Sequence, residues 1–397
     1  MTVLLSLLFS LSVNGKTYQT FTMDEAVAIA LANHPVARNI ALSEKKDAII
    51  QQQSLEFSSL QVKYWQRNAG STGADRLWTV TQDFGSIPEH FRRSQHNRTV
   101  VSTQNVEREL TLDELAWQVK SAYMDAVYYR QRLQIMQEHA DFFEALISDA
   151  EIHLFVDDSI SALKKVSAGS RFAAYHSRMY IAEEELKRAE IRLRQLMYIP
   201  EGTIELSQTE LQLYQIHPDK YFDERFDPVK HTAMDAAQLA VAQSAVKLEK
   251  SKLFPALHAG YIYQNIEGMN GYQGLMIGLS VPLWMQPQRA RIKLAEMDVD
   301  EKIYETNYRQ FADRQHVEML KSLLNEYFVQ ISYRKENLLL EAQLTLDEIA
   351  NDFWAERITD YAEAFSKASY AVYAKLEHLE YINLYNKTAL ELEFFTQ

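Results

Sequence analysis

Two very long stretches of the chain, residues 89–168 and 288–397, contain neither glycine nor proline. These two residue types most often interrupt regular structure, so each stretch can form helix far longer than is usual in a globular domain. A helix of that length buries its apolar side only against another helix. The sequence therefore predicts a mainly α protein built on long coiled-coil helical hairpins.

The apolar residues in these stretches recur in alternating steps of three and four, which is the spacing of a coiled-coil seam. The outgoing helix of the first half carries Leu112, Leu115, Val119, Ala122, Ala126, Tyr129, Leu133, Met136, Ala140, Phe143, Ile147, Ala150 and Leu154. Its returning helix carries Met179, Ala182, Leu186, Ala189, Leu193 and Leu196. The second half repeats the spacing at Val317, Leu320, Leu324, Tyr327 and Ile331. A helix over residues 92–154 would be about 95 Å long.

Eight of the 11 glycines fall in two short windows, at 70–85 and 260–278. In the second window four apolar residues alternate with small or polar ones: Leu275, Ile277, Leu279 and Val281 against Gly274, Met276, Gly278 and Ser280. Such alternation is typical of a strand with one face in lipid. The segment 257–264 alternates in the same way, and Tyr272 and Trp284 flank the last strand as candidate interfacial aromatics.

The first glycine window alternates less clearly, over residues 61–65 and 76–82. A water-exposed β-hairpin is the alternative interpretation there. No segment after the N-terminal run approaches the roughly 18 consecutive apolar residues of a membrane helix. Any membrane crossing must therefore be made by β-strands.

The two halves of the chain repeat each other. The tripeptide Ser-Ile-Pro at 86–88 returns as Ser-Val-Pro at 280–282, and the seam at 119–133 returns at 317–331. This internal duplication predicts two structural repeats, at 16–200 and 226–397. The expected parts are a helix, a β-hairpin at about 60–83 and a helical hairpin at about 90–199, then a linker at 201–225, then a helix, a β-hairpin at about 256–283 and a helical hairpin at about 288–395.

Four strands per chain cannot close a barrel, since a closed barrel needs about eight or more. Open strand edges are not tolerated in lipid, so other copies must complete the sheet. Three copies would give a 12-stranded barrel, with the helical hairpins forming an α-barrel beneath it.

Residues 3–13 form an apolar run, too short to span a bilayer and followed by small residues near Gly15. We interpret residues 1–15 as a signal peptide for export. A buried N-terminal helix is the alternative.

Composition and motifs argue against several functions. The net charge of −13 disfavours nucleic acid as a partner. Cysteine is absent, which excludes disulfides and thiolate chemistry. Phosphate-loop, dinucleotide-binding and nucleophile-elbow motifs are missing, so we expect no catalytic residue, no cofactor and no enzyme activity. The methionines and histidines show no metal-binding spacing, and core packing explains Met136 and Met179. A lone weak metal contact at His258 is the alternative.

The order of elements resembles that of the TolC-like family of outer-membrane efflux proteins, over nearly the whole mature chain. The resemblance is carried by the segments 23–35 (MDEAVAIALANHP), 253–261 (LFPALHAGY) and 279–291 (LSVPLWMQPQRAR). The C-terminal segment 381–395 (YINLYNKTALELEFF) is most similar to the branch that serves heavy-metal cation efflux pumps.

The resemblance implies a homotrimer in the cell outer membrane, with helices that extend into the periplasm as a tunnel. It would act as the passive exit duct of a tripartite pump and conduct metal cations or drugs. Its partners would be a periplasmic adaptor and an inner-membrane pump of the proton-driven cation-efflux type. A protein-secretion outlet is one alternative. A soluble periplasmic coiled-coil adaptor without a barrel is the other.

The two helix turns, at 155–163 and 353–361, would meet at the periplasmic entrance. Their charged residues are the predicted gate and selectivity set: Asp157, Asp158, Glu356, Arg357 and Asp360. In a trimer each carboxylate becomes a ring of three, which favours cations. Arg357 would pair with a neighbouring Asp158 or Asp360 and hold the entrance shut. The alternative is that these are solvated turn residues. Asp158 and Glu356 stand where the family usually has glycine.

Overall fold

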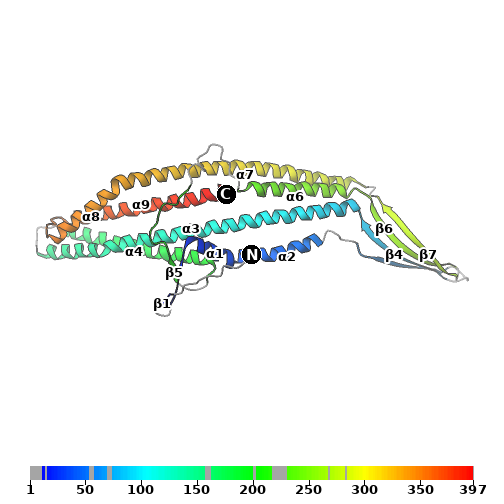
Figure 1. The fold of residues 1–397 in the computed structure, drawn as a ribbon, viewed down its shortest axis with the longest axis horizontal. Helices are drawn as coiled ribbons and strands as arrows, with labels where there is room; N and C mark the ends of the chain where they lie inside the picture. The colour runs from blue at the N-terminus through cyan, green and yellow to red at the C-terminus, as the bar shows by residue number, and fades with distance from the viewer. Residues whose placement is uncertain are drawn as a thin grey trace. The chain divides into compact units, whose positions relative to one another are not determined.

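The computed structural model describes residues 11–13, 16–52, 58–68, 74–156, 162–199, 203–216, 230–266, 269–281 and 284–396. The chain forms two compact units. A helical unit comprises Met1–Arg38, Thr111–Pro228 and Asp313–Gln397, and a sheet unit comprises Asn39–Leu110 and Val229–Ala312. Two long helices, α3 (Ile87–Val156) and α7 (Gln286–Tyr333), contribute residues to both (Figure 1).

The helical unit also contains α1 (Met23–Asn33), α4 (Ala162–Met197), α8 (Leu339–Trp354) and α9 (Tyr361–Thr396). Helix α3 ends at Val156 and α4 begins at Ala162, while α8 ends at Trp354 and α9 begins at Tyr361. The second turn therefore falls within the predicted range 353–361, and residues 157–161 of the first lie outside the described residues. Thr22 caps α1 through a reciprocal capping box with Glu25, the arrangement that satisfies two free N–H groups at a helix start.

The predicted seam forms the core of the helical unit. Val119, Ala126 and Phe143 are fully buried, as are Ala182 and Leu193 on the returning helix, and Val317, Leu320 and Leu324 are at most 3% exposed. Phe143 contacts Tyr175 and Phe365, with ring centroids 4.7 and 4.9 Å away. Burying one such aromatic side chain contributes about 1.5–3 kcal/mol. The core therefore joins α3, α4 and α9, which come from both halves of the chain.

A small sheet in the helical unit has no counterpart in the sequence prediction. Strand β2 (Lys16–Phe21) pairs antiparallel with β1 (Leu11–Val13) and parallel with β5 (Thr203–Leu206). The sequence predicted only a linker over 201–225. The residues after β5 are also held in place: the buried Asn386 donates to the Gln212 carbonyl at 2.8 Å and accepts from the Tyr214 N–H at 2.7 Å.

The sequence predicts an uninterrupted outgoing helix in the second half, whereas the structure interrupts it. A π-helical turn, η2 (Arg334–Leu338), separates α7 from α8. Arg334 forms an ion pair with Glu377 at 2.8 Å and lies 4.8 Å from the centre of the Tyr381 ring. No glycine or proline marks this turn, so the apolar spacing alone does not reveal it.

The sheet unit contains α2 (Pro35–Gln52), β3 (Gln61–Asn68), β4 (Ala74–Gly85), α6 (Thr232–Ser251), β6 (Ala256–Ile266) and β7 (Met269–Ser280). Strands thus occupy both glycine windows. The four strands form one antiparallel sheet in the order β3-β4-β6-β7. In the described chain β3 and β7 are its edges.

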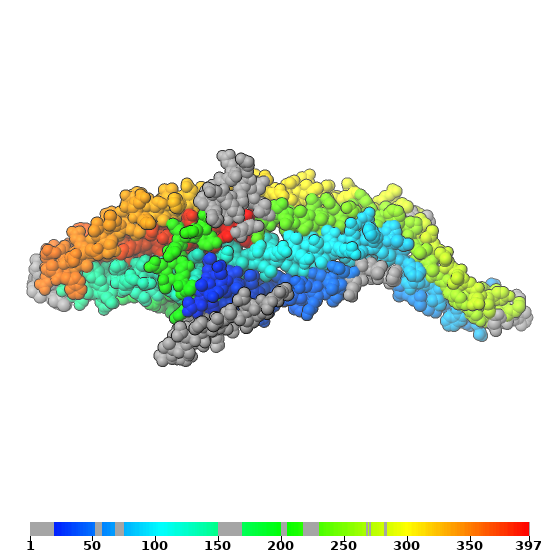
Figure 2. Space-filling view, viewed as in Figure 1, coloured from blue at the N-terminus to red at the C-terminus, as the bar shows by residue number. Residues whose placement is uncertain are grey.

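The helices of the sheet unit lie side by side in the same order as the strands to which they connect. Asn97 on α3 donates to the Ile50 carbonyl on α2 at 3.1 Å, and His96 on α3 lies 2.6 Å from Ser244 on α6. Gln288 on α7 contacts α6 in turn. Figure 2 shows α2, α3, α6 and α7 side by side in this order, in blue, cyan, green and yellow.

Each repeat also contains an ion pair between its short and long helices. Arg108 lies 2.6 Å from Asp47, with both side chains 10% exposed, and Arg309 lies 2.8 Å from Asp235, which is 3% exposed. Breaking a buried pair such as Arg108–Asp47 costs about 3–5 kcal/mol, and the pair of the more exposed Arg309, at 37%, contributes less.

Among the helices in the described part of the chain, none is both long enough and apolar enough to cross a membrane.

Candidate functional site

One face of the four-stranded sheet is apolar across all its strands. Residues directly opposite in antiparallel strands project from the same face. The register pairs Val62 with Val80, Val80 with Tyr261 and Tyr261 with Leu275, so one apolar row crosses all four strands. We call this the apolar face; its apolar members are Val62, Tyr64, Trp78, Val80, Leu257, Ala259, Tyr261, Tyr263, Leu275, Ile277 and Leu279, and it also carries Gln82 and Gln273, opposite Ala259 and Tyr263.

The apolar face is open to the surroundings in the single chain. Leu275 is 86% exposed, Ile277 79% and Leu279 66%. Exposing this apolar face to water would destabilise the protein, because each Å² of apolar surface in water costs about 25 cal/mol. The apolar residues of the first glycine window, whose alternation in the sequence is weak, also lie on this face according to the strand register.

The opposite face is mixed: Trp65, Leu77, Ile262 and Met276 lie on it, and small or polar residues fill most of its remaining positions. It includes Thr79, Thr81, Asp83, His258, Gly260, Gly278 and Ser280. A side-chain carbon at Gly278 would overlap the imidazole of His258, and one at Gly260 would lie 2.8 Å from Thr81 and 3.1 Å from Met276. The glycines therefore let His258 and Met276 lie across the neighbouring strand.

Aromatic residues bound the apolar face at both ends. Tyr64 and Trp78 are paired, with ring centroids 4.7 Å apart, and Trp78 is paired with Tyr263. Beyond this row the same face turns polar, at Gln66, Arg76 and Asn265. At the helix end, Phe254 is 55% exposed and Trp284 89%. Rings in these positions suit a membrane–water interface.

Strand length also fits a membrane crossing. Strands β4, β6 and β7 contain 12, 11 and 12 residues, and a tilted transmembrane strand needs about 9–11. Strand β3, with eight residues, is the shortest of the four strands in this sheet.

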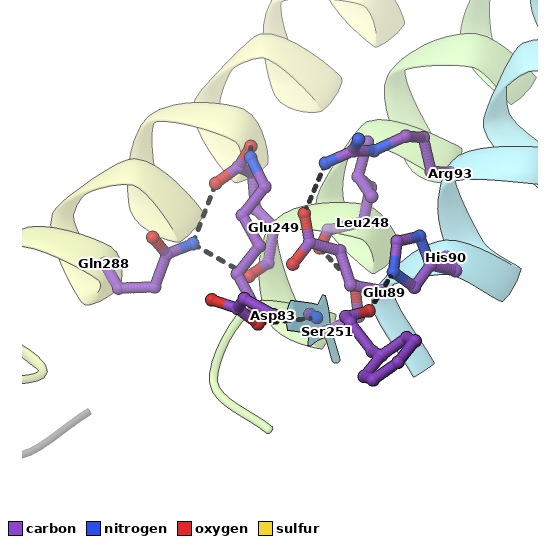
Figure 3. Close-up of polar contacts among 11 residues, drawn as sticks. Asp83, Glu89, His90, Arg93, Leu248, Glu249, Ser251 and Gln288 are labelled. Carbon is purple, nitrogen blue, oxygen red and sulfur yellow. Dashed lines mark hydrogen bonds and ion pairs between the residues drawn. The ribbon is translucent and has the colours of Figure 1, made fainter. Parts of the chain in front are cut away.

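Polar contacts fix the passage from sheet to helices (Figure 3). His90 Nε2 lies 2.6 Å from the Phe84 carbonyl, and Gly85, at φ +68°, donates its N–H to Asp83 at 2.8 Å. Gln288 donates to both the carbonyl and the carboxylate of Glu249, at 2.8 Å each. The chain therefore leaves the sheet into α3 and α7 in a defined direction.

The second helix turn is closed by backbone and side-chain contacts. Glu356 adopts a left-handed conformation, φ 53°, while the Arg357 N–H donates to the Asp352 carbonyl at 2.9 Å and the Glu356 N–H to the Phe353 carbonyl at 3.1 Å. This is a Schellman motif, whose left-handed position is usually glycine. The Arg357 guanidinium also lies 3.0 Å from the Asp352 carboxylate.

The start of α9 is tied to α3. Asp360 caps α9, accepting from the N–H groups of Ala362 and Glu363 at 3.0 and 3.1 Å. The next residue, Tyr361, donates its hydroxyl to Asp149 Oδ2 at 2.6 Å. Burial, and then the hydrogen bond to Asp149, raise the pKa of Tyr361, so the hydroxyl remains a donor at neutral pH.

The predicted gate residues have different positions. Asp157 and Asp158 lie outside the described residues, whereas Glu356, Arg357 and Asp360 lie in one turn. Within this chain the ion-pair partner of Arg357 is Asp352 rather than Asp360, because the Schellman turn directs residue 357 back toward the end of α8.

The turn borders an acidic groove of about 390 Å³. Its charged lining residues are Glu348, Asp352, Arg357, Asp360, Glu363 and Lys367. Four carboxylates thus face two cations. Within the described ranges, no group of three or more His, Asp or Glu side chains is arranged to hold a metal ion.

Asp149 and Asp352 are not predicted from the sequence. The Tyr361–Asp149 contact joins residues that are 212 positions apart in the sequence. A local sequence pattern cannot indicate a contact over such a separation.

Comparison with solved structures shows which proteins share this fold. The Campylobacter jejuni CmeC outer membrane channel has a TM-score of 0.72 at 12% identity, covering 94% of this chain and 85% of that one. The open state of the Neisseria gonorrhoeae MtrE outer membrane channel has a TM-score of 0.69 at 12% identity, covering 94% and 90%. CusC, described as forming a transmembrane channel, has 0.71 at 14% identity, covering 93% and 90%.

At the level of sequence, no protein-family model and no curated protein matches the chain. The likenesses to solved structures therefore establish the fold.

Proposed function

We propose that three identical copies of this chain form one passive exit channel of the TolC-like type in the outer membrane. The observation that carries the proposal is the apolar face, which is exposed, bounded by aromatic rings and formed by strands of which three have the length of a membrane crossing. Lipid is the environment in which such a face is stable. The long helical hairpins then lie on the periplasmic side.

The need for further copies follows from the edges of the sheet. In the described chain β3 and β7 each pair on one side only, and unpaired edges are not stable in lipid. The helices beside these edges carry exposed apolar residues in heptad spacing. Leu42 and Ile49 on α2 are each 57% exposed. The stripe on α7 consists of Leu294, Met297, Tyr304, Tyr308 and Phe311, each more than half exposed.

These features support a head-to-tail arrangement, in which β7 and α7 of one copy meet β3 and α2 of the next. A heterologous contact of this type closes into a ring when the rotation between copies allows it. Three copies supply 12 strands, enough to close a barrel.

The helix turns supply a candidate gate at the periplasmic entrance. The Tyr361–Asp149 hydrogen bond and the Arg357–Asp352 ion pair hold the second turn in its present position. The carboxylates of the adjoining groove favour cations at such an entrance. Asp157 and Asp158 of the first turn stay part of this proposal.

The channel itself performs no chemistry, and the energy for export comes from its partners. We propose a periplasmic adaptor and an inner-membrane pump as those partners, with metal cations or drugs as cargo. The likeness of residues 381–395 to the heavy-metal branch favours the cation-efflux type of pump.

Cross-linking tests the proposed assembly directly. The chain contains no cysteine, so introduced thiols are the only ones present. With Gln66→Cys and Gln273→Cys on the two edge strands, a bifunctional thiol reagent should give covalent dimers and trimers but no larger species. The control pair is Arg76→Cys with Asn265→Cys, which face each other within the chain and should link only internally. Monomers alone from the edge pair, or a ladder beyond three, would contradict the assembly.

A further inference from the structure

The ends of the helices that adjoin the sheet carry a surplus of positive charge. The segments 87–98, 247–254 and 284–293 contain nine basic and two acidic residues, a net charge of +7, although the whole chain has a net charge of −13. We call these basic residues the basic collar: Arg92, Arg93, Arg98, Lys247, Lys250, Lys252, Arg289, Arg291 and Lys293.

Much of this charge is not neutralised within the chain. Arg93 pairs with Glu89, Lys252 with Glu249, and Lys250 with Glu296. By contrast Arg98 and Arg289 are exposed and form no ion pair with any described residue, whereas Lys293 is close enough to Glu296 to lower the pKa of that carboxyl. The collar therefore has exposed guanidinium groups available for an anionic partner.

The collar lies directly beside the aromatic end of the apolar face. Trp284 is 89% exposed and precedes Arg289 by less than two helical turns, and Phe91 is 67% exposed next to Arg92. The Arg92 guanidinium lies 5.8 Å from the centre of the Phe91 ring. Rings at an interface with basic residues just outside it are the pattern that places cations at the depth of lipid headgroups.

We propose that the basic collar binds the headgroups of anionic phospholipids in the membrane leaflet nearest the helices. This inference rests on the proposed function, since it requires the apolar face to be in a membrane. Phosphate is the group that arginine binds in a bidentate manner, and clusters of four to eight basic residues beside a membrane segment attract anionic lipid. The collar anchors the sheet–helix junction at a fixed depth, where the contacts of Figure 3 set the direction of the helices.

The experiment uses the purified full chain in vesicles that contain brominated lipid, which quenches tryptophan fluorescence on contact. Brominated phosphatidylglycerol and brominated phosphatidylcholine are compared at the same mole fraction. We expect stronger quenching by the anionic lipid. With Arg289→Gln, Arg291→Gln and Lys293→Gln combined, the preference should fall by roughly tenfold or more. The matched control, Arg171→Gln, Arg188→Gln and Arg192→Gln on α4, removes the same charge and should keep the preference.

Each outcome has a separate meaning. Insertion into pure phosphatidylcholine vesicles, followed by protease protection, tests the membrane location by itself, and a protein that fails to insert there contradicts the proposed function. An inserted protein without preference for the anionic lipid overturns the collar inference alone, as does an equal loss in the α4 control. Loss of the preference on adding millimolar inorganic phosphate, at constant ionic strength, would also overturn it, because the collar would then bind soluble anions.

Discussion

Tyr361, the first residue of α9, donates a hydrogen bond of 2.6 Å to Asp149 on α3. The two residues belong to different repeats, so this contact joins the second helix turn to the first hairpin. Burial and the hydrogen bond raise the pKa of the tyrosine, so the contact does not depend on pH near neutrality. In the channel that we propose, it stabilises the closed position of the turn.

Replacing Tyr361 with phenylalanine should open the channel more often. The change removes one hydrogen bond to a charged group, worth about 1.5–3 kcal/mol, which corresponds to at least about a tenfold shift between closed and open states. Single-channel recording measures the shift. The control is Tyr370→Phe on the same helix, where the ring is 71% exposed, and its record should match that of the unchanged protein. Equal behaviour of the two variants would contradict a role for the contact.

Neutralising Arg357 tests the ion pair at the end of α8. Both partners are exposed, 65% and 43%, so Arg357→Gln should change the stability of the fold by no more than about 1 kcal/mol. We expect it to raise the closed-state conductance, and Asp352→Asn should have the same effect. Unchanged conductance and ion selectivity in both variants would remove Arg357 from the gate.

Glycine at position 356 should stabilise the turn. Glu356 is held at φ 53°, a conformation that costs an ordinary residue about 1 kcal/mol and glycine almost nothing. Glu356→Gly should therefore raise the thermal unfolding temperature in detergent, whereas Glu356→Ala, which keeps the strain, should not. A gain in the alanine variant as large as in the glycine variant would show that loss of the carboxylate is the cause.

A charge on the apolar face should prevent membrane insertion. Ile277→Lys places an ammonium group among lipid tails, at a cost of about 2–4 kcal/mol near the bilayer centre. Met276→Lys, one residue earlier, projects from the opposite face and should be tolerated. Folding into vesicles, followed by protease protection, separates the two. Equal insertion would mean that the faces are not in different environments.

The heptad seam and the two strand windows are the parts of the fold that the sequence predicts well. Both rest on local periodicity: steps of three and four for Val119 to Phe143, and steps of two for Leu275 to Leu279. These periodicities can be recognised without knowing which elements pack together, because the spacing alone determines on which face of a helix or strand each residue lies.

The contacts that the sequence did not predict are those between distant segments or those without a breaker residue. The pairing of β2 with β5 joins residues near 20 to residues near 205, and the turn η2 contains no glycine or proline. The sequence predicts that Arg357 lies in the turn. Its ion pair with Asp352 depends on the left-handed conformation of Glu356, which directs Arg357 back toward the end of α8. A glycine at position 356 would have signalled the motif, whereas glutamate gave no signal.

Single-channel recording of the purified protein in a planar bilayer, together with its particle size in detergent, tests the central claim most directly. We expect discrete, cation-selective conductance from a particle of three chains. A monomer that stays in solution without detergent and never inserts would contradict the membrane channel, and would favour a coiled-coil protein of the periplasm instead.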